Sequence, residues 1–121
     1  KEFEKAEEVL SLSLNISEEY RYLRDESIAV GNLGWVFYSQ QRYERAIHYF
    51  ERKLKMSTKL GDKLEIINTL NNLAESYKQI GRFHDAIEAF RQLSDECHSI
   101  GDLENEQATR EIIQEIEACF L

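Results

Sequence analysis

The chain has 121 residues, of which 31% are charged and 42% are apolar, and it contains no proline and only five glycines. The formal net charge of −8 disfavours nucleic acid and anionic membranes as partners, because both require a basic surface that displaces counterions. It is more compatible with a basic protein or peptide. No run of about 18 apolar residues occurs, so the sequence predicts no membrane-spanning helix. Abundant Glu, Lys and Leu without proline favour an all-α protein.

Apolar residues recur at spacings of three and four along the chain, which is typical of amphipathic helices. Because the links at residues 40–42 and 80–82 are short, the helices that they join must run antiparallel. The predicted helices cover residues 2–20, 24–40, 43–59, 64–80, 83–99 and 103–120.

Glycine and aspartate mark the junctions that follow the predicted helices 43–59 and 83–99. Gly61 and Gly101 suit the left-handed residue that commonly follows a helix. Asp62 and Asp102 can cap the N-terminus of the helix that comes next. Asp62 and Glu65 also have the spacing of a capping box, with Asp in place of the usual Ser or Thr.

The sequence repeats itself with a period of 40 residues. Eight of the 36 positions from 27 to 62 recur as identical residues 40 positions later, where about two would be expected by chance. The identities pair Asn32-Leu33 with Asn72-Leu73, Arg42 with Arg82, Ala46-Ile47 with Ala86-Ile87, Phe50 with Phe90, and Gly61-Asp62 with Gly101-Asp102. Small residues at 34, 46, 74 and 86 are predicted to let helices approach closely while aromatic residues fill the gaps.

Two copies of one apolar pattern resemble the tetratricopeptide repeat. The first copy is Val30-x2-Leu33-Gly34-x2-Phe37 followed by Ala46-x3-Phe50, and the second is Leu70-x2-Leu73-Ala74-x2-Tyr77 followed by Ala86-x3-Phe90. The period exceeds the usual ~34 residues, and no proline ends the second helix of each unit. These longer repeats look like those of Pins-type spindle-orientation adaptors and kinesin light chains. The resemblance implies a right-handed α-solenoid of antiparallel helix pairs.

The repeat register divides the chain into four parts. Residues 1–22 are predicted to be the second helix of a preceding repeat, 23–62 and 63–102 to be full repeats, and 103–121 to be a C-terminal capping helix. We expect the chain to belong to a longer array or larger complex, because its first residues already align with the second helix of a unit. Val9, Leu10, Leu14 and Ile16 are then expected to meet another repeat.

The family resemblance implies a peptide-binding groove lined by the first helix of each repeat. Helical spacing alone agrees with this groove assignment, because it places five polar residues on one helix face: Asn68, Asn71, Asn72, Glu75 and Gln79. The predicted groove residues are Gly31, Asn32, Trp35, Tyr38 and Ser39 in one repeat and Asn68, Asn71, Asn72, Glu75, Lys78 and Gln79 in the next.

These groove residues have structural alternatives. Asn68 and Asn71 are predicted to face a ligand, whereas a hydrogen-bond ladder between helices is favoured for the recurring Asn32 and Asn72. Trp35 and Tyr38, one helical turn apart, could bind a partner or pack against the preceding unit. The recurring arginines at 42 and 82 are interpreted as solvated turn residues.

Nothing in the sequence predicts catalysis or a cofactor. The three histidines are scattered, and none has a metal-ligand spacing with Cys97 or Cys119. Both cysteines are expected to be reduced thiols, which favours an intracellular protein. The cytoplasm is the expected location, with cytoskeletal association or the nucleus as alternatives. The leading hypothesis is therefore a scaffold that binds a protein or peptide. An architectural spacer and a peptide-sensing regulatory domain are the alternatives.

Overall fold

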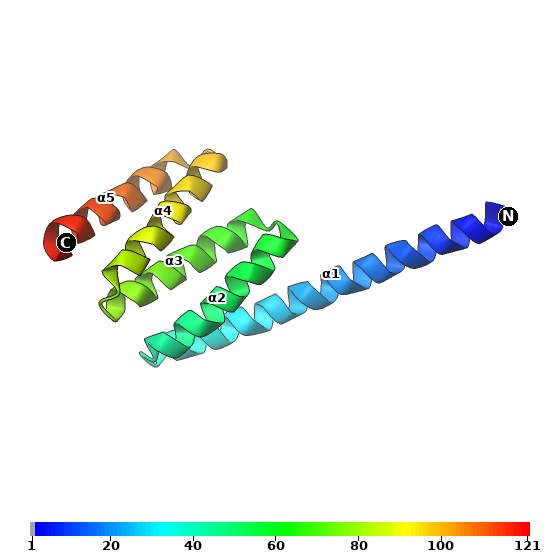
Figure 1. Cartoon of the computed structure of the whole chain (residues 1–121), viewed down its shortest axis with the longest axis horizontal. Coiled ribbons are helices and arrows are strands. Elements are labelled where there is room, and N and C mark those ends of the chain that lie inside the picture. Colours follow the sequence, from blue (N-terminus) through cyan, green and yellow to red (C-terminus); the bar gives the residue numbers. More distant parts are fainter. Residues whose placement is uncertain (1) are drawn as a thin grey trace.

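The computed structural model describes the backbone of residues 2–121, with side chains described at Lys5, Glu8, Leu12 and residues 15–121. Five α-helices make up almost all of this range, and no strand occurs within it (Figure 1). The helices are α1 (Glu2–Ser39), α2 (Tyr43–Leu60), α3 (Lys63–Gln79), α4 (Phe83–Ser99) and α5 (Leu103–Phe120). Each helix packs on the next one along the chain, as in a tetratricopeptide-type solenoid. The predicted all-α solenoid of antiparallel helix pairs is confirmed.

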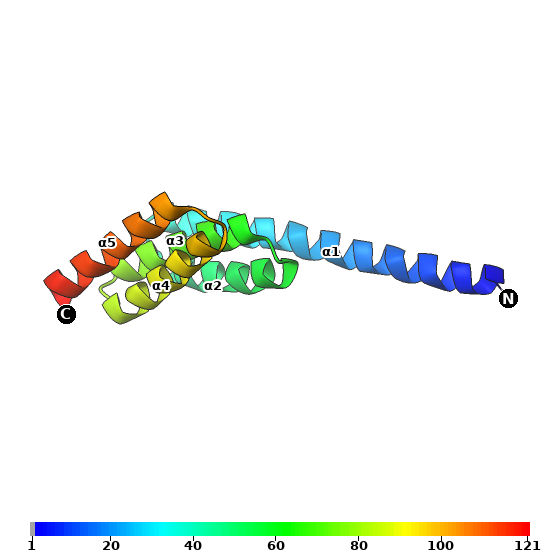
Figure 2. The same ribbon diagram turned by 90° about the horizontal axis from the view of Figure 1, so that it is seen from above.

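The N-terminal helix differs from the prediction. A break between residues 20 and 24 was expected, but α1 continues for 38 residues. The physical reason is local, because Arg21 and Tyr22 occupy the positions that Gly61 and Asp62 occupy 40 residues later. Without a left-handed glycine or a capping aspartate, nothing ends the helix there. The first half of α1 therefore projects beyond α2 in both views (Figures 1 and 2).

The apolar residues predicted to meet another repeat lie in this projecting half. The side chains of Val9, Leu10 and Leu14 lie outside the described residues. Ile16 is 58% exposed. The assignment of residues 1–22 to a preceding repeat stays a prediction.

The two predicted Gly-Asp junctions are confirmed. Gly61 and Gly101 adopt left-handed φ values of 67° and 78°. Asp62 Oδ1 accepts a hydrogen bond from the Glu65 backbone N–H at 3.3 Å, and Asp102 Oδ1 accepts one from the Asn105 backbone N–H at 3.2 Å. The reciprocal half of the capping box is replaced by another contact, because the Glu65 carboxylate pairs with Lys53 of α2 at 2.8 Å.

Close packing of small against aromatic residues joins the paired helices. A Cβ atom added to Gly34 of α1 would lie 2.7 Å from the Phe50 ring of α2, so no larger residue fits there. Phe50 is only 1% exposed, and the equivalent Ala74 and Phe90 of the next pair are 0% exposed. These side chains form the centre of the continuous core that runs from α2 to α5.

Comparison of equivalent positions shows which helix face is covered by the preceding helix. In α5, which packs on α4, the buried positions are Glu106, Thr109, Ile113 and Ile116. The positions 40 residues earlier, Ile66, Thr69, Leu73 and Ser76, are likewise buried in α3.

Within the described residues, α2 is the helix that packs on α1, and the corresponding face of α1 is left uncovered. Leu33 and Val36, which are equivalent to the buried Leu73 and Ser76, remain 45% and 48% exposed. The N-terminal edge of the stack thus ends in an apolar face.

This difference predicts unequal costs for the same substitution at two equivalent positions. Leu73→Ala should lower the free energy of unfolding by about 3 kcal/mol, because it leaves a cavity in the core. Leu33→Ala should cost less than about 1 kcal/mol, because that side chain is already half exposed. Urea denaturation followed by circular dichroism measures both, and equal losses would contradict an uncovered α1 face.

Candidate partner-binding surface

The first helices of the repeats share one side of the molecule. Figure 2 shows the second half of α1, α3 and α5 on one side, with α2 and α4 on the other. We call the outward-facing residues of α1 from 28 to 39, of α3 and of α5 the first-helix surface. The alternation follows from the short links, because each antiparallel pair returns the chain to the same side.

Most of the predicted groove residues reach solvent on this surface. Five of them are exposed, namely Asn32, Trp35, Asn68, Asn71 and Gln79, and four are half-buried, namely Tyr38, Asn72, Glu75 and Lys78. Ser39 is also exposed, and its hydroxyl donates to the Trp35 carbonyl at 2.9 Å. Gly31 is an exception, because it is buried and a Cβ atom there would lie 2.6 Å from the Lys53 side chain of α2. Its predicted place in the groove is wrong.

Three aromatic rings cluster where α1 turns into α2. Trp35 and Tyr38 stack with ring centroids 5.3 Å apart and an interplanar angle of 9°. Tyr43 meets Tyr38 edge-on at 5.4 Å. Burial raises the pKa of Tyr38, and the nearby carboxylate of Glu75 raises it further. Trp35 remains 53% exposed, so a large aromatic face is open to a partner.

The expected asparagine ladder is not present. Within residues 15–121, none of the side-chain hydrogen bonds uses the amide of Asn32 or Asn72. Asn72 takes part only through its backbone carbonyl, which accepts from the Ser76 hydroxyl at 2.7 Å. The amides of this surface are thus left for solvent or a ligand.

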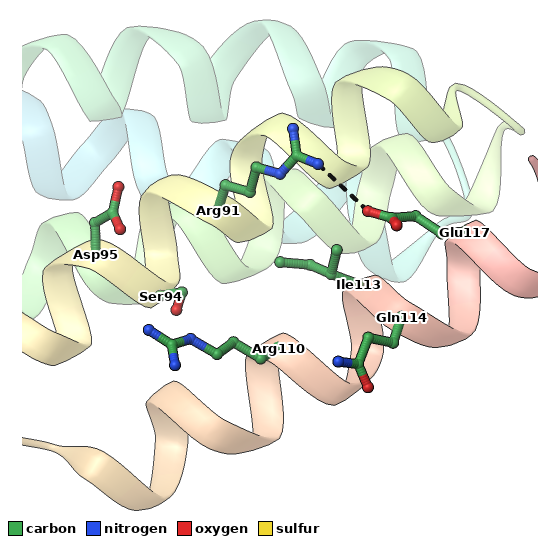
Figure 3. A pocket seen from close by; sticks show the side chains of 7 residues that line it. All are labelled: Arg91, Ser94, Asp95, Arg110, Ile113, Gln114 and Glu117. Carbon is green, nitrogen blue, oxygen red and sulfur yellow. Dashed lines mark hydrogen bonds and ion pairs between the residues drawn. The ribbon is translucent and has the colours of Figure 1, made fainter.

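A pocket that the sequence analysis missed lies between α4 and α5 (Figure 3). It has a volume of about 430 Å³, and Ile113 lies between the two helices. Arg91 pairs with Glu117 across it at 3.3 Å. The pocket lining consists of Arg91, Ser94, Asp95, Arg110, Ile113, Gln114 and Glu117.

The ion pair across this pocket has a counterpart 40 residues earlier in the chain. Arg91 and Glu117 are equivalent to Glu51 and Tyr77, whose side chains also meet, with Tyr77 Oη donating to Glu51 Oε1 at 2.7 Å. Burial raises the pKa of Tyr77 above its usual range, and the hydrogen bond to Glu51 raises it further. The same pair of positions therefore joins a second helix to the following first helix in both repeats. Knowledge of the 40-residue register could have predicted this pairing.

One of the two recurring arginines also has a structural role. Arg82 pairs with Asp85 at 2.8 Å, and its guanidinium lies 4.8 Å from the centre of the Tyr77 ring. Arg82 is exposed at the turn that precedes α4, as predicted, and makes these two contacts from there. Arg42 is exposed and precedes α2 without a side-chain cap.

The described side chains offer little for metal or nucleophilic chemistry. No group of three or more His, Cys, Asp or Glu residues among them could hold a metal ion. The cysteines are free, with Cys97 buried and Cys119 exposed. Burial raises the pKa of the Cys97 thiol, as do the nearby carboxylates of Asp102, Glu106 and Glu96. Among the described helices, none combines the length and apolarity that crossing a bilayer would need.

Comparison with known families identifies the repeat. A family model described as tetratricopeptide repeat matches residues 29–64 and 69–104, which is more than half of the chain. The chain therefore belongs to the tetratricopeptide repeat family. None of the curated proteins compared with the chain matches it significantly. Repeats of this family generally mediate protein–protein interactions and are typically not enzymes.

The two cysteines should react differently with a thiol reagent. At neutral pH, Ellman's reagent should modify Cys119 rapidly and Cys97 only after unfolding, because Cys97 is 1% exposed and its pKa is raised. Stability should also fall as the pH rises above the ordinary thiol pKa of about 8.5, because the unfolded chain then loses the Cys97 proton more readily than the folded chain. Rapid native labelling of a Cys119→Ser variant would contradict this assignment.

The single tryptophan of the chain reports on the first-helix surface. Because Trp35 is half exposed, its fluorescence should be quenched readily by acrylamide in the folded protein. Trp35→Ala should lower the free energy of unfolding by no more than about 1 kcal/mol. An emission spectrum typical of a buried indole, resistant to quenching, would mean that this surface is covered in solution.

Proposed function

We propose that the chain is an interaction module that holds a segment of a partner protein against the first-helix surface. The observation that carries this proposal is the set of side-chain amides of Asn68, Asn71 and Asn72 on α3, together with the stacked aromatic pair of α1, in which Trp35 is exposed and Tyr38 is half-buried. Both features lie on the helices that face one side of the stack.

The chemistry of these residues suits an extended peptide. A side-chain amide offers both a donor and an acceptor, so it can pair with the N–H and C=O groups of a partner backbone. Asparagine costs roughly 0.5 kcal/mol per site relative to alanine in a helix, and three within five residues favour a role beyond helix formation. Trp35 and Tyr38 can supply the apolar contact area that commonly dominates binding energy.

The position of the chain within a larger protein is part of the proposal. In α5, Arg110, Gln114 and Glu117 replace the apolar Leu70, Ala74 and Tyr77, and all three are exposed. This polar face supports α5 as the cap of the array. We propose a cytoplasmic scaffold or adaptor, in line with the resemblance to Pins-type adaptors and kinesin light chains.

An architectural spacer is the second candidate. It is favoured by the uncovered apolar face of α1, where Leu33 and Val36 are half exposed. An array that meets other units through this edge would use its ends and the second helices α2 and α4, which we call the outer helices, in place of the first-helix surface.

Two double variants distinguish these functions. Asn71→Ala with Asn72→Ala should abolish capture of the partner from cell extract, because it removes two peptide-binding amides without touching the core. Arg52→Glu with Lys55→Glu reverses two exposed charges on α2 and should leave capture unchanged. Circular dichroism and thermal melting verify that both variants are folded.

The reverse pattern would reject the proposal. If the folded asparagine variant retains its partners while the α2 variant loses them, function resides on the outer helices, and the spacer is the better account.

A further inference from the structure

One repeat position on the first-helix surface carries an aromatic ring in one unit and carboxylates in the next two. Trp35 of α1, Glu75 of α3 and Glu115 of α5 lie 40 residues apart and so occupy the same position on three successive first helices. Trp35 and Glu115 are exposed, and Glu75 is half-buried. The three form a row across the surface, which we call the acidic row.

The two carboxylates of this row are not engaged by the basic groups around them. Six ion pairs and one histidine–carboxylate contact occur among the described residues, and none includes Glu75 or Glu115. Lys78 lies one turn along α3 from Glu75 but not within ion-pair distance. The acidic charge of the row is thus available to a partner.

The aromatic member of the row also lacks a cation. Three arginines lie over aromatic rings in the described part of the chain, namely Arg45 over Phe37, Arg52 over Tyr49 and Arg82 over Tyr77. None of them lies over Trp35, although indole is the ring that attracts a cation most strongly.

The aromatic pair and the first carboxylate act on the same region. The carboxylate of Glu75 is close enough to Tyr38 to affect its ionisation, and Tyr38 stacks on Trp35. A cation placed over the exposed indole face would therefore also experience the field of Glu75.

We propose that the acidic row selects a partner segment with basic side chains, one placed over Trp35 beside Glu75 and another at Glu115. Alternate side chains of an extended segment point the same way, so two basic residues can reach the row together. Arginine suits the first position better than lysine, because its planar guanidinium stacks on an aromatic ring. The net charge of −8 adds long-range attraction for such a segment. This inference rests on the proposed function and names the class of partner.

A pair of synthetic peptides tests the charge requirement. The probe is a fluorescein-labelled ten-residue peptide of alternating Ser and Arg, and the control replaces each Arg by citrulline, which has nearly the same shape but no charge. Fluorescence anisotropy with the full chain should show binding of the arginine peptide that weakens with added salt. The citrulline peptide should bind much more weakly.

Matched variants locate the charge effect. Glu75→Gln with Glu115→Gln should weaken binding of the arginine peptide about 5-fold, and Trp35→Ala should weaken it about 3-fold. Glu88→Gln with Asp95→Asn makes the same change in net charge on α4, where both residues are exposed. This control should change the Kd less than about 2-fold.

Three results would overturn the inference: no binding of the arginine peptide, equal binding of the citrulline peptide, or equal weakening by the α4 control. The proposed function is tested separately by the asparagine variants. If the asparagine variants lose partner capture while the arginine and citrulline peptides bind alike, the proposed binding surface is supported and the proposed selectivity for basic segments is rejected. If partner capture survives the asparagine substitutions, the proposed function itself fails.

Discussion

The close contact between the Phe50 ring and the backbone of Gly34 is the constraint on which the rest of the arrangement depends. A Cβ atom on Gly34 would lie 2.7 Å from the Phe50 ring, so the ring packs against a residue that has no side chain. The equivalent Ala74 of α3 and Phe90 of α4 are both fully buried. Because the pairs are built alike and joined by similar Gly-Asp turns, successive first helices return to the same side. A surface that recurs every 40 residues is the consequence, and the candidate binding residues lie on it.

Much of this fold is predictable, because its determinants are local. The 3–4 spacing and the Gly-Asp junctions predict α2 to α5 to within one residue at each end. The error in α1 arose from extending the repeat register to a place where its ending residues are absent. The 40-residue repeat register predicts which positions are apolar, but where a helix ends depends on the particular residues at that place, here Arg21 and Tyr22. Conversely, a helix can end without glycine, since Gln41 adopts a left-handed φ of 62° in the turn that follows α1.

The candidate site was only partly predictable for a different physical reason. Helical spacing determines which face a residue occupies, so the exposure of Asn68, Asn71 and Trp35 could be foreseen. Spacing does not determine the hydrogen-bond partner of an exposed amide, and the expected asparagine ladder therefore failed. The prediction that Gly31 lines the groove was wrong because its side of α1 is occupied by the long Lys53 side chain of α2. Contacts between helices distinguish a surface position from a packed one.

The most direct test of the central claim is to record the side-chain amide NMR signals of the chain with and without its bound partner segment. Binding on the first-helix surface predicts that the signals of Asn68, Asn71 and Asn72 shift, while the signal of Gln92, on the exposed side of α4, stays in place. A shift of Gln92 with unchanged asparagine signals would place the partner on the outer helices and contradict the account.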